Sequence, residues 1–254
     1  MAVSDINQSF LDRNYFLLRR LHSLAGIVPI GAFLIFHLTT NSSILWGDWL
    51  NEAGHGHAGV ETFQHEVNFI HSLPALILME ILVLFVPIAF HALLGIVFAL
   101  TGRINVVAYG YGDNWRYTLQ RLTGYLGVIF IFMHITSLRF GWTYGGLMPV
   151  FDPPHAASST AAHFQDGAWG LFVTVFYLVC VLALVFHLAN GLWTAALTWG
   201  LIISEEAQKR WGYICAVIGL GLGLATILAV YGFTILNVEG AHEVELNMLA
   251  AGGH

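Results

Sequence analysis

Residues 171–192 read LFVTVFYLVCVLALVFHLANGL, a run without any Asp, Glu, Lys or Arg. A helix needs about 20 mostly apolar residues to cross the hydrocarbon core of a bilayer, and this run is long enough. This run and four others in the chain are continuous, and they lack the alternation of polar and apolar residues that a membrane β-strand shows. Five such segments predict membrane-spanning helices, at about 21–45, 73–101, 119–140, 168–203 and 213–236. The sequence therefore predicts an all-α integral membrane protein with five transmembrane helices.

The composition supports a membrane protein. Of the 254 residues, 57% are hydrophobic and only 9% are charged, and the mean hydropathy is +0.72. Soluble domains carry about 25% charged residues, so an ordinary water-soluble enzyme is excluded. A net charge of −6 with nine Lys and Arg leaves no basic surface of the size that nucleic-acid binding needs. We expect one transmembrane domain over residues 1–254.

The basic residues predict the orientation of the chain. Eight of the nine Lys and Arg residues flank the predicted helices on one side, and only Arg139 lies on the other. Because basic loops stay in the cytoplasm, the N-terminus is expected inside and the C-terminus outside. The segment before the first span lacks the apolar core of a signal peptide. We expect the outer segments 46–71 and 141–167 to be long loops and the tail 237–254 to be mobile.

Histidines occur deep inside four of the apolar runs, one in each of the first four predicted helices. They are His37, His91, His134 and His187. Ionisable side chains within a membrane are energetically expensive and mark functional sites. A single buried histidine is usually one that is hydrogen-bonded to a backbone carbonyl, but four on consecutive helices favour a common function.

Their depths divide these histidines into two pairs. With a rise of 1.5 Å per residue, His37 and His134 lie about 24 and 22 Å from the cytoplasmic starts of their helices. The second and fourth helices run inward, and His91 and His187 lie roughly 27–29 Å from their outer ends. Two axial imidazoles on one iron are what a six-coordinate b heme needs. The pattern predicts an outer and an inner heme b bound by helices one to four, with the fifth helix peripheral.

Glycines support the heme interpretation. Gly95 and Gly191 each follow an inner histidine by four residues, so each lies one helical turn further along the same face. A flat porphyrin could approach the backbone there, although close packing of small residues between helices is the alternative. Cys180 and Cys215 lie in apolar runs outside any CxxCH motif, which excludes covalent c-type heme attachment.

Six stretches carry a resemblance to a known family. They are RRLHSLAG (19–26), FLIFHL (33–38), HSLPALILMEI (71–81), FHALLG (90–95), LQRLTG (119–124) and FHLANGLW (186–193). With them the chain resembles the diheme cytochrome b membrane anchor of succinate:quinone oxidoreductases and quinol:fumarate reductases, in its single-subunit, five-helix form. The heme ligands of that family fall on the four histidines that depth pairs.

The resemblance implies an electron-transferring anchor subunit of succinate dehydrogenase or fumarate reductase that has no flavin catalysis of its own. Its partners would be membrane lipid, a flavoprotein that holds FAD, and an iron–sulfur protein on the cytoplasmic face of a bacterial membrane. Electrons would pass through the two hemes to or from a quinone, which in this branch is menaquinone. Val185 replaces a glutamate that one branch has two residues before the inner ligand, so a proton route through that position is in doubt.

Glu80 is a candidate for the quinone chemistry. It lies about seven residues below the outer end of the second helix, level with the outer heme. A lone carboxylate at this depth costs a few kcal/mol, so it should be paired, protonated or functional. Quinol oxidation needs a proton acceptor, and we predict this role for Glu80. A structural partner such as Arg139 is the alternative.

Five cationic or imidazole side chains near the ends of the helices could contact heme propionates or quinone, because the arginine fork matches a carboxylate. They are Arg19, Arg20, His22, Arg121 and Arg139. For those on the cytoplasmic side, simple anchoring by positive charge is equally compatible with the sequence. The remaining histidines of the outer segments match no closed zinc pattern, and we expect them to be solvated: His55, His57, His65, His71, His155 and His163. His71 is the first candidate for an exception, because it borders the second helix near Glu80.

Two other functions remain open from the residues alone. A cytochrome b subunit of another quinone-linked dehydrogenase, such as a hydrogenase or a formate dehydrogenase, would share the heme chemistry and differ in its partner. A heme-free transporter or proton channel would use the histidines as proton relays. A visible spectrum and the identity of co-purified subunits distinguish the three functions.

Overall fold

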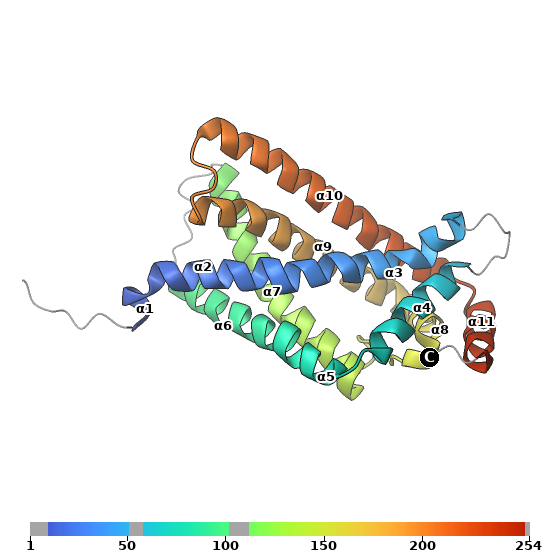
Figure 1. Ribbon diagram of the computed structural model, residues 1–254. Helices are drawn as coiled ribbons and strands as arrows, with labels where there is room; N and C mark the ends of the chain where they lie inside the picture. Colours follow the sequence, from blue (N-terminus) through green and yellow to red (C-terminus); the bar gives the residue numbers. More distant parts are fainter. Residues whose placement is uncertain (1–9, 51–57, 102–111, 252–254) are drawn as a thin grey trace, which may run out of the picture.

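The computed structural model describes residues 10–50, 58–101 and 112–251 (Figure 1). Throughout these ranges the regular structure is helical, and five segments are long and apolar enough to cross a membrane. These spans are Tyr15–Gly47, Leu76–Thr101, Asn114–Phe140, Gly167–Thr198 and Glu205–Ile235. The prediction of an all-α protein with five transmembrane helices is confirmed.

Two of the spans are interrupted by π-helical segments. The first span consists of α2 (Tyr15–Ala25), η1 (Gly26–Gly31) and α3 (Ala32–Leu50). The second consists of α5 (Leu76–Met79), η2 (Glu80–Phe85) and α6 (Val86–Thr101). Pro29 lies inside η1, where its missing N–H prevents the regular hydrogen bond of an α-helix. Short π-helical segments within α-helices are frequent at functional sites.

The other spans are continuous helices: α7 (Gly112–Phe140), α9 (Gly167–Thr198) and α10 (Glu205–Ile235). Several helices begin before the apolar runs do, because hydropathy detects only the part within the bilayer. At the start of α10 the Ser204 hydroxyl accepts a hydrogen bond from the Ala207 N–H at 3.2 Å and caps the helix. Gly200, with a φ of +71°, follows the end of α9.

Helix α10 lies at the side of the bundle, as expected for the fifth helix. It packs against α9 and α3, and glycines permit the close approach. A Cβ atom on Gly232 would lie 2.5 Å from Ile44 Cγ2, and one on Gly219 would lie 3.0 Å from Ala189 Cβ. The first span, α6, α7 and α9 carry the four intramembrane histidines.

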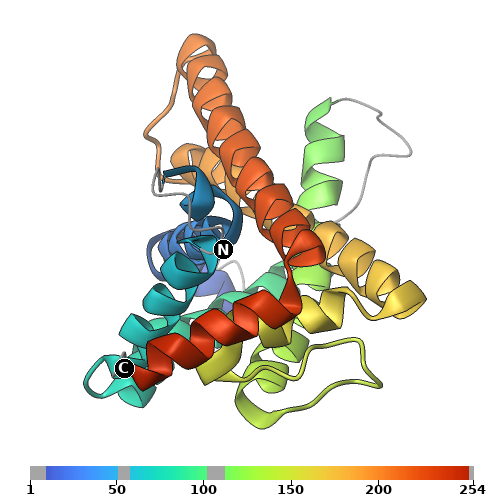
Figure 2. The same ribbon diagram turned by 90° about the vertical axis from the view of Figure 1, so that its right-hand side faces the viewer.

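Short helices cover the end of the bundle where the first span finishes, which we term the capped end (Figures 1 and 2). They are α4 (Ala58–Ser72), η3 (Pro153–His155), α8 (Ala156–Phe164) and α11 (Val238–Ala250). Figure 2, which views this end, shows α11 running from α10 toward α4.

The expectation of long outer loops is confirmed for residues 141–152 but is wrong for residues 58–71 and 153–164, which are helical. The tail, which we expected to be mobile, forms helix α11. These segments are polar overall, so hydropathy alone reads them as loops, yet α4 is amphipathic. Its buried residues Val60, Phe63, Gln64 and Val67 recur at the spacing of one helix face. Within the tail, the side chains of Ala241 and Glu245 in α11 are fully buried.

The buried Glu245 carboxylate joins α11 to the N-terminus of α8. It accepts hydrogen bonds from the backbone N–H groups of Ala157 and Ser158 at 2.7 and 3.1 Å and from the Ser158 hydroxyl at 2.5 Å. The first N–H groups of a helix have no partner within the helix, and a negative charge is favourable there. One side chain therefore satisfies three buried donors and attaches the tail to the cap.

We expect Glu245→Ala to destabilise the capped end, because all three donors lose their acceptor. A buried unsatisfied donor costs about 1–3 kcal/mol, so the free energy of unfolding should fall by about 3 kcal/mol, measured by thermal unfolding of the purified protein. Glu245→Gln, which keeps one acceptor oxygen, should lose less. Glu243→Ala, at an exposed position of α11, is the matched control. Equal losses in the Glu245→Ala and Glu243→Ala variants would refute the role of the carboxylate.

Candidate functional site

The four intramembrane histidines meet as two pairs. The ring centres of His37 on α3 and His134 on α7 are 5.9 Å apart, with their planes at 75°. The ring centres of His91 on α6 and His187 on α9 are 6.0 Å apart, with their planes at 85°. Metal–imidazole bonds of about 2.0–2.1 Å would place the ring centres of two opposed ligands roughly 6 Å apart. Both spacings match a single metal ion held between two rings.

Hydrogen bonds orient both rings of the His91–His187 pair. His91 Nδ1 lies 2.8 Å from the carbonyl oxygen of His22, and His187 Nδ1 lies 3.0 Å from that of Gln120. A carbonyl oxygen can only accept, so each Nδ1 carries the proton and donates it. Each Nε2 therefore keeps its lone pair. A backbone acceptor on one ring nitrogen is the usual arrangement for a metal-binding histidine.

The His37–His134 pair lacks such restraints. The Nδ1 atom of His134 is buried and has no hydrogen-bond partner among the described residues, and the ring stacks on Phe130 with centres 5.5 Å apart. The His37 ring stacks on Phe33, and its Nε2 lies 3.5 Å from the Asn41 amide nitrogen. Buried polar atoms normally have a partner. A buried imidazole nitrogen without a partner, on a ring close to a second imidazole, fits a site that a ligand would complete.

Glycines leave room beside the His91–His187 pair. A Cβ atom on Gly26 would clash with His91 Cε1, and one on Gly124 would lie 3.1 Å from His187 Cε1. The sequence pattern indicated Gly95 and Gly191 instead. The neighbours of Gly95 and Gly191 are His22 Nε2 and the Gln120 amide, at 3.2 and 3.6 Å from the position of a Cβ. Gly26 and Gly124 end the stretches RRLHSLAG and LQRLTG, which is the signal that could have identified them.

Three of the candidate propionate contacts cluster near the start of the first span. The guanidinium of Arg19 lies 5.3 Å from the ring centres of Tyr15 and Phe98. That of Arg20 lies 5.8 Å from the Trp199 ring. The His22 ring stacks on His91 with centres 4.0 Å apart. Of these three residues, only His22 contacts one of the paired histidines through its own ring.

Arg121 faces the end of α6. Its guanidinium donates to the carbonyl oxygens of Phe98, at 3.2 Å, and Ala99. The last carbonyls of a helix have no partner within it, and a cation is favourable there. Arg121 therefore caps α6 and joins the second span to the third.

Glu80 and Arg139 form an ion pair. Arg139 donates to the Glu80 carboxylate at 2.6 Å, and both side chains are partly exposed. Arg139 follows His134 by five residues of α7, or about 7.5 Å along the helix. Glu80 begins the π-helical segment η2. The pair joins the second and third spans on the side of His134 toward the capped end, and it is the structural partner that the sequence left open for Glu80.

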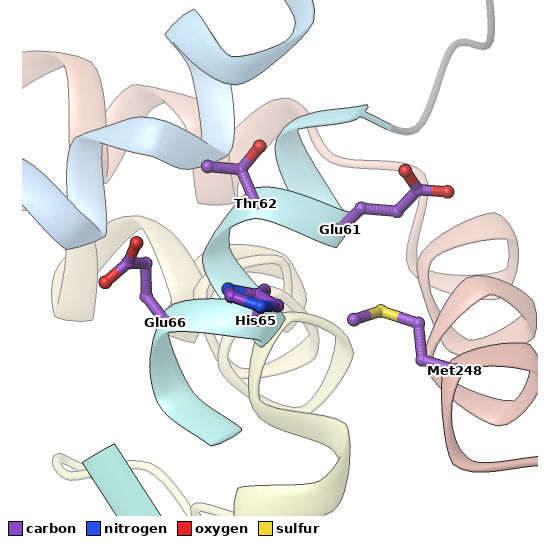
Figure 3. Close-up of a pocket in the computed structure, with 5 residues that line it drawn as sticks. All are labelled: Glu61, Thr62, His65, Glu66 and Met248. Carbon is purple, nitrogen blue, oxygen red and sulfur yellow. The ribbon is translucent and has the colours of Figure 1, made fainter. Parts of the chain in front are cut away.

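The capped end holds the remaining described histidines. His155 Nδ1 lies 2.8 Å from the Asp152 carboxylate, and burial lowers the pKa of His163 despite the nearby Asp166. Among the described side chains, no three His, Cys, Asp or Glu are grouped as they would be to hold a metal ion. His65 lines a pocket between α4 and α11 (Figure 3). His55 and His57 lie outside the described residues.

A polar network beside His187 was missed as a site by sequence analysis. Asn190 and Arg116 lie next to Gln120, and Asn190 is buried. Arg116 is one of the eight basic residues whose positions predict the orientation of the chain, and nothing in the hydropathy pattern distinguishes it from the other seven. The FHLANGLW stretch places Asn190 three residues after His187, which is one helical turn.

Comparison with known proteins identifies the family. No family model matches the chain. Over 218 residues the chain is 33% identical to the succinate dehydrogenase cytochrome b558 subunit of Bacillus subtilis (strain 168), with 86% of this chain and 96% of the relative covered. The chain belongs to the succinate dehydrogenase cytochrome b subunit family. The resemblance seen in the sequence is thereby confirmed, and this cytochrome b subunit is a multi-pass membrane protein.

Proposed function

We propose that this cytochrome b subunit holds two b hemes and passes electrons between an iron–sulfur protein and menaquinone. Family membership makes the subunit a membrane anchor of complex II. The observation that carries the diheme proposal is the meeting of four intramembrane histidines in two pairs with ring centres 5.9 and 6.0 Å apart. His37 and His134 would hold one heme, and His91 and His187 the other.

A b heme with two imidazole ligands supplies one-electron transfer with no open coordination site. The protein orients its rings for this role. The carbonyl oxygens of His22 and Gln120 hold the Nδ1 protons of His91 and His187, so that each Nε2 keeps the lone pair that an iron ion would need. Gly26 and Gly124 keep side chains out of the same region.

The orientation follows from the distribution of charge. With eight of nine basic residues at one end, we place the N-terminus in the cytoplasm of a bacterium and the capped end outside. The His91–His187 heme is then the inner one. It faces the side where the iron–sulfur protein and the FAD-containing flavoprotein would dock. The subunit itself would carry no flavin chemistry.

We place the site of quinone chemistry near the Glu80–Arg139 ion pair. The pair lies beyond His134 toward the capped end, in a region where the second span is π-helical. A carboxylate whose charge is balanced by an arginine can be maintained within the span, and it can receive a proton when quinol is oxidised. Arg139 offers the fork that binds a carbonyl or carboxylate oxygen. We assign Arg19, Arg20 and His22 to the propionates of the inner heme, whereas the Arg121 guanidinium is engaged by the last carbonyl oxygens of α6.

A visible spectrum of the purified protein tests the heme proposal directly. Reduced-minus-oxidised b-type bands are expected, and their absence would favour a proton channel or transporter. Co-purification with a flavoprotein and an iron–sulfur protein that oxidise succinate is expected. Co-purification with a hydrogenase or formate dehydrogenase would reassign the partner.

The pairing makes a prediction for single substitutions. His37→Ala and His134→Ala should lose the same heme, and His91→Ala and His187→Ala should lose the other, because each iron needs both of its ligands. Redox titration of the visible bands, which resolves hemes of different potential, measures which one is lost. His65→Ala, at an exposed position of the cap, should retain both hemes and is the control. Loss of one heme shared by the His37→Ala and His91→Ala variants would show that the pairs are wrong.

Glu80→Gln tests the quinone site. The amide is nearly isosteric with the carboxylate and cannot accept the proton, so quinone-linked turnover should fall at least tenfold. This loss is smaller than the 10²–10⁴-fold contribution that general acid–base catalysis usually makes to a rate, because water can relay protons. Both hemes and succinate oxidation with an artificial dye should persist. Glu66→Gln, an exposed glutamate of α4, should leave turnover unchanged. Near-normal quinone activity in Glu80→Gln would make the ion pair purely structural and move the search to His71 and Arg139.

A further inference from the structure

Three polar side chains form a hydrogen-bonded chain that ends at His187. Arg116 Nε donates to Asn190 Oδ1 at 2.9 Å, and Asn190 Nδ2 donates to Gln120 Oε1 at 2.8 Å. Gln120 Nε2 then donates to the backbone oxygen of His187 at 3.1 Å. We term Arg116, Asn190 and Gln120 the Arg116 relay. It connects α7 and α9 at the end of the bundle opposite the cap.

The relay has only one consistent direction. A guanidinium can only donate, so Asn190 must turn its oxygen to Arg116 and its amide nitrogen to Gln120. Gln120 must then accept through its oxygen, which leaves its amide nitrogen for the carbonyl of His187. The backbone oxygen of Gln120 accepts from His187 Nδ1 at 3.0 Å. Arg116 thus fixes the orientation of two amides. The side-chain amide of Gln120 bonds the backbone oxygen of His187, and the backbone carbonyl of the same residue bonds the His187 ring.

The surroundings of the relay increase the electrostatic effect of the positive charge on Arg116. Asn190 is 5% exposed, and the Arg116 guanidinium lies 3.9 Å from the centre of the Trp193 ring. Among the side chains that the structure describes, no carboxylate lies within 4 Å of this guanidinium. Arg116 is partly buried, and charges that are partly shielded from water interact over longer distances than charges in bulk water. A positive charge there stabilises the reduced state of a neighbouring redox centre, because reduction adds one electron.

We infer that the Arg116 relay positions the His187 ring and raises the reduction potential of the heme held by His91 and His187. Groups that hydrogen-bond to a metal ligand orient it and tune the metal. The inference rests on the proposed function, since it requires a heme at this pair. Arg116, Asn190 and Gln120 act as positioning residues through His187.

Redox titration of the purified complex tests the inference. In the Arg116→Met variant, the equilibrium constant for one-electron reduction of the His91–His187 heme should fall roughly tenfold. This corresponds to a decrease of about 59 mV in the midpoint potential of that heme. The midpoint potential of the other heme should not change. Arg116→Lys keeps the charge and should remain close to the wild type. Lys209→Met removes the same charge from an exposed position on α10 and should shift neither heme.

The Asn190→Leu variant tests the hydrogen-bonded connection to His187 separately from the charge of Arg116. It breaks the relay while Arg116 remains, so the potential of the same heme should fall by less than in Arg116→Met, and its low-spin electron paramagnetic resonance signal should shift as the ring turns. Loss of this heme alone in any relay variant would also support positioning of His187.

Three outcomes would overturn the inference. They are unchanged potentials in both Arg116→Met and Asn190→Leu, equal shifts of both hemes, and loss of both hemes. The wild-type spectrum separates these results from a failure of the proposed function. If the wild type shows no b-type bands, the heme proposal fails. If it shows two hemes that the relay variants leave unaltered, only the relay is refuted.

Discussion

The bond from each ring Nδ1 of His91 and His187 to a backbone carbonyl is the interaction on which the interior of this bundle depends. The bilayer core offers no water, so a polar group there must find its partner within the protein. His22 O belongs to the first span and Gln120 O to the third. Both carbonyls lie within helices, and each is shared with a side chain of a neighbouring helix. Through these bonds the two rings connect four helices.

The two pairs differ in how firmly the protein holds them. The His91–His187 pair is fixed by two carbonyls and bordered by Gly26 and Gly124. His134 packs against Phe130, and its buried Nδ1 has no acceptor among the described residues. Aromatic packing fixes the plane of a ring but not which nitrogen carries the proton. Hydrogen bonds therefore restrain the rings of the His91–His187 pair, whereas aromatic packing restrains those of the His37–His134 pair.

Much of this architecture could be predicted from the sequence, and the part that could not has a physical explanation. Long apolar runs identify the spans because the bilayer imposes their length. A constant rise per residue brings His37 level with His134 without any knowledge of packing. The cap escaped prediction because α4, α8 and α11 have only 15, 9 and 13 residues, too few to form the long apolar runs that identify a span. Arg116 escaped because its partners, Asn190 and Trp193, are more than 70 residues away in the chain.

The attachment of α11 by Glu245 has a consequence for biosynthesis. The N-terminus of α8 lies between the third and fourth spans, but its acceptor follows the fifth. Ala157 and Ser158 must therefore wait for α11 to be translated and moved to the same side of the membrane. Until then the first backbone N–H groups of α8 and the Ser158 hydroxyl lack the acceptor that Glu245 supplies. A stop codon just after α10 would spare every membrane span and still leave these donors without that acceptor.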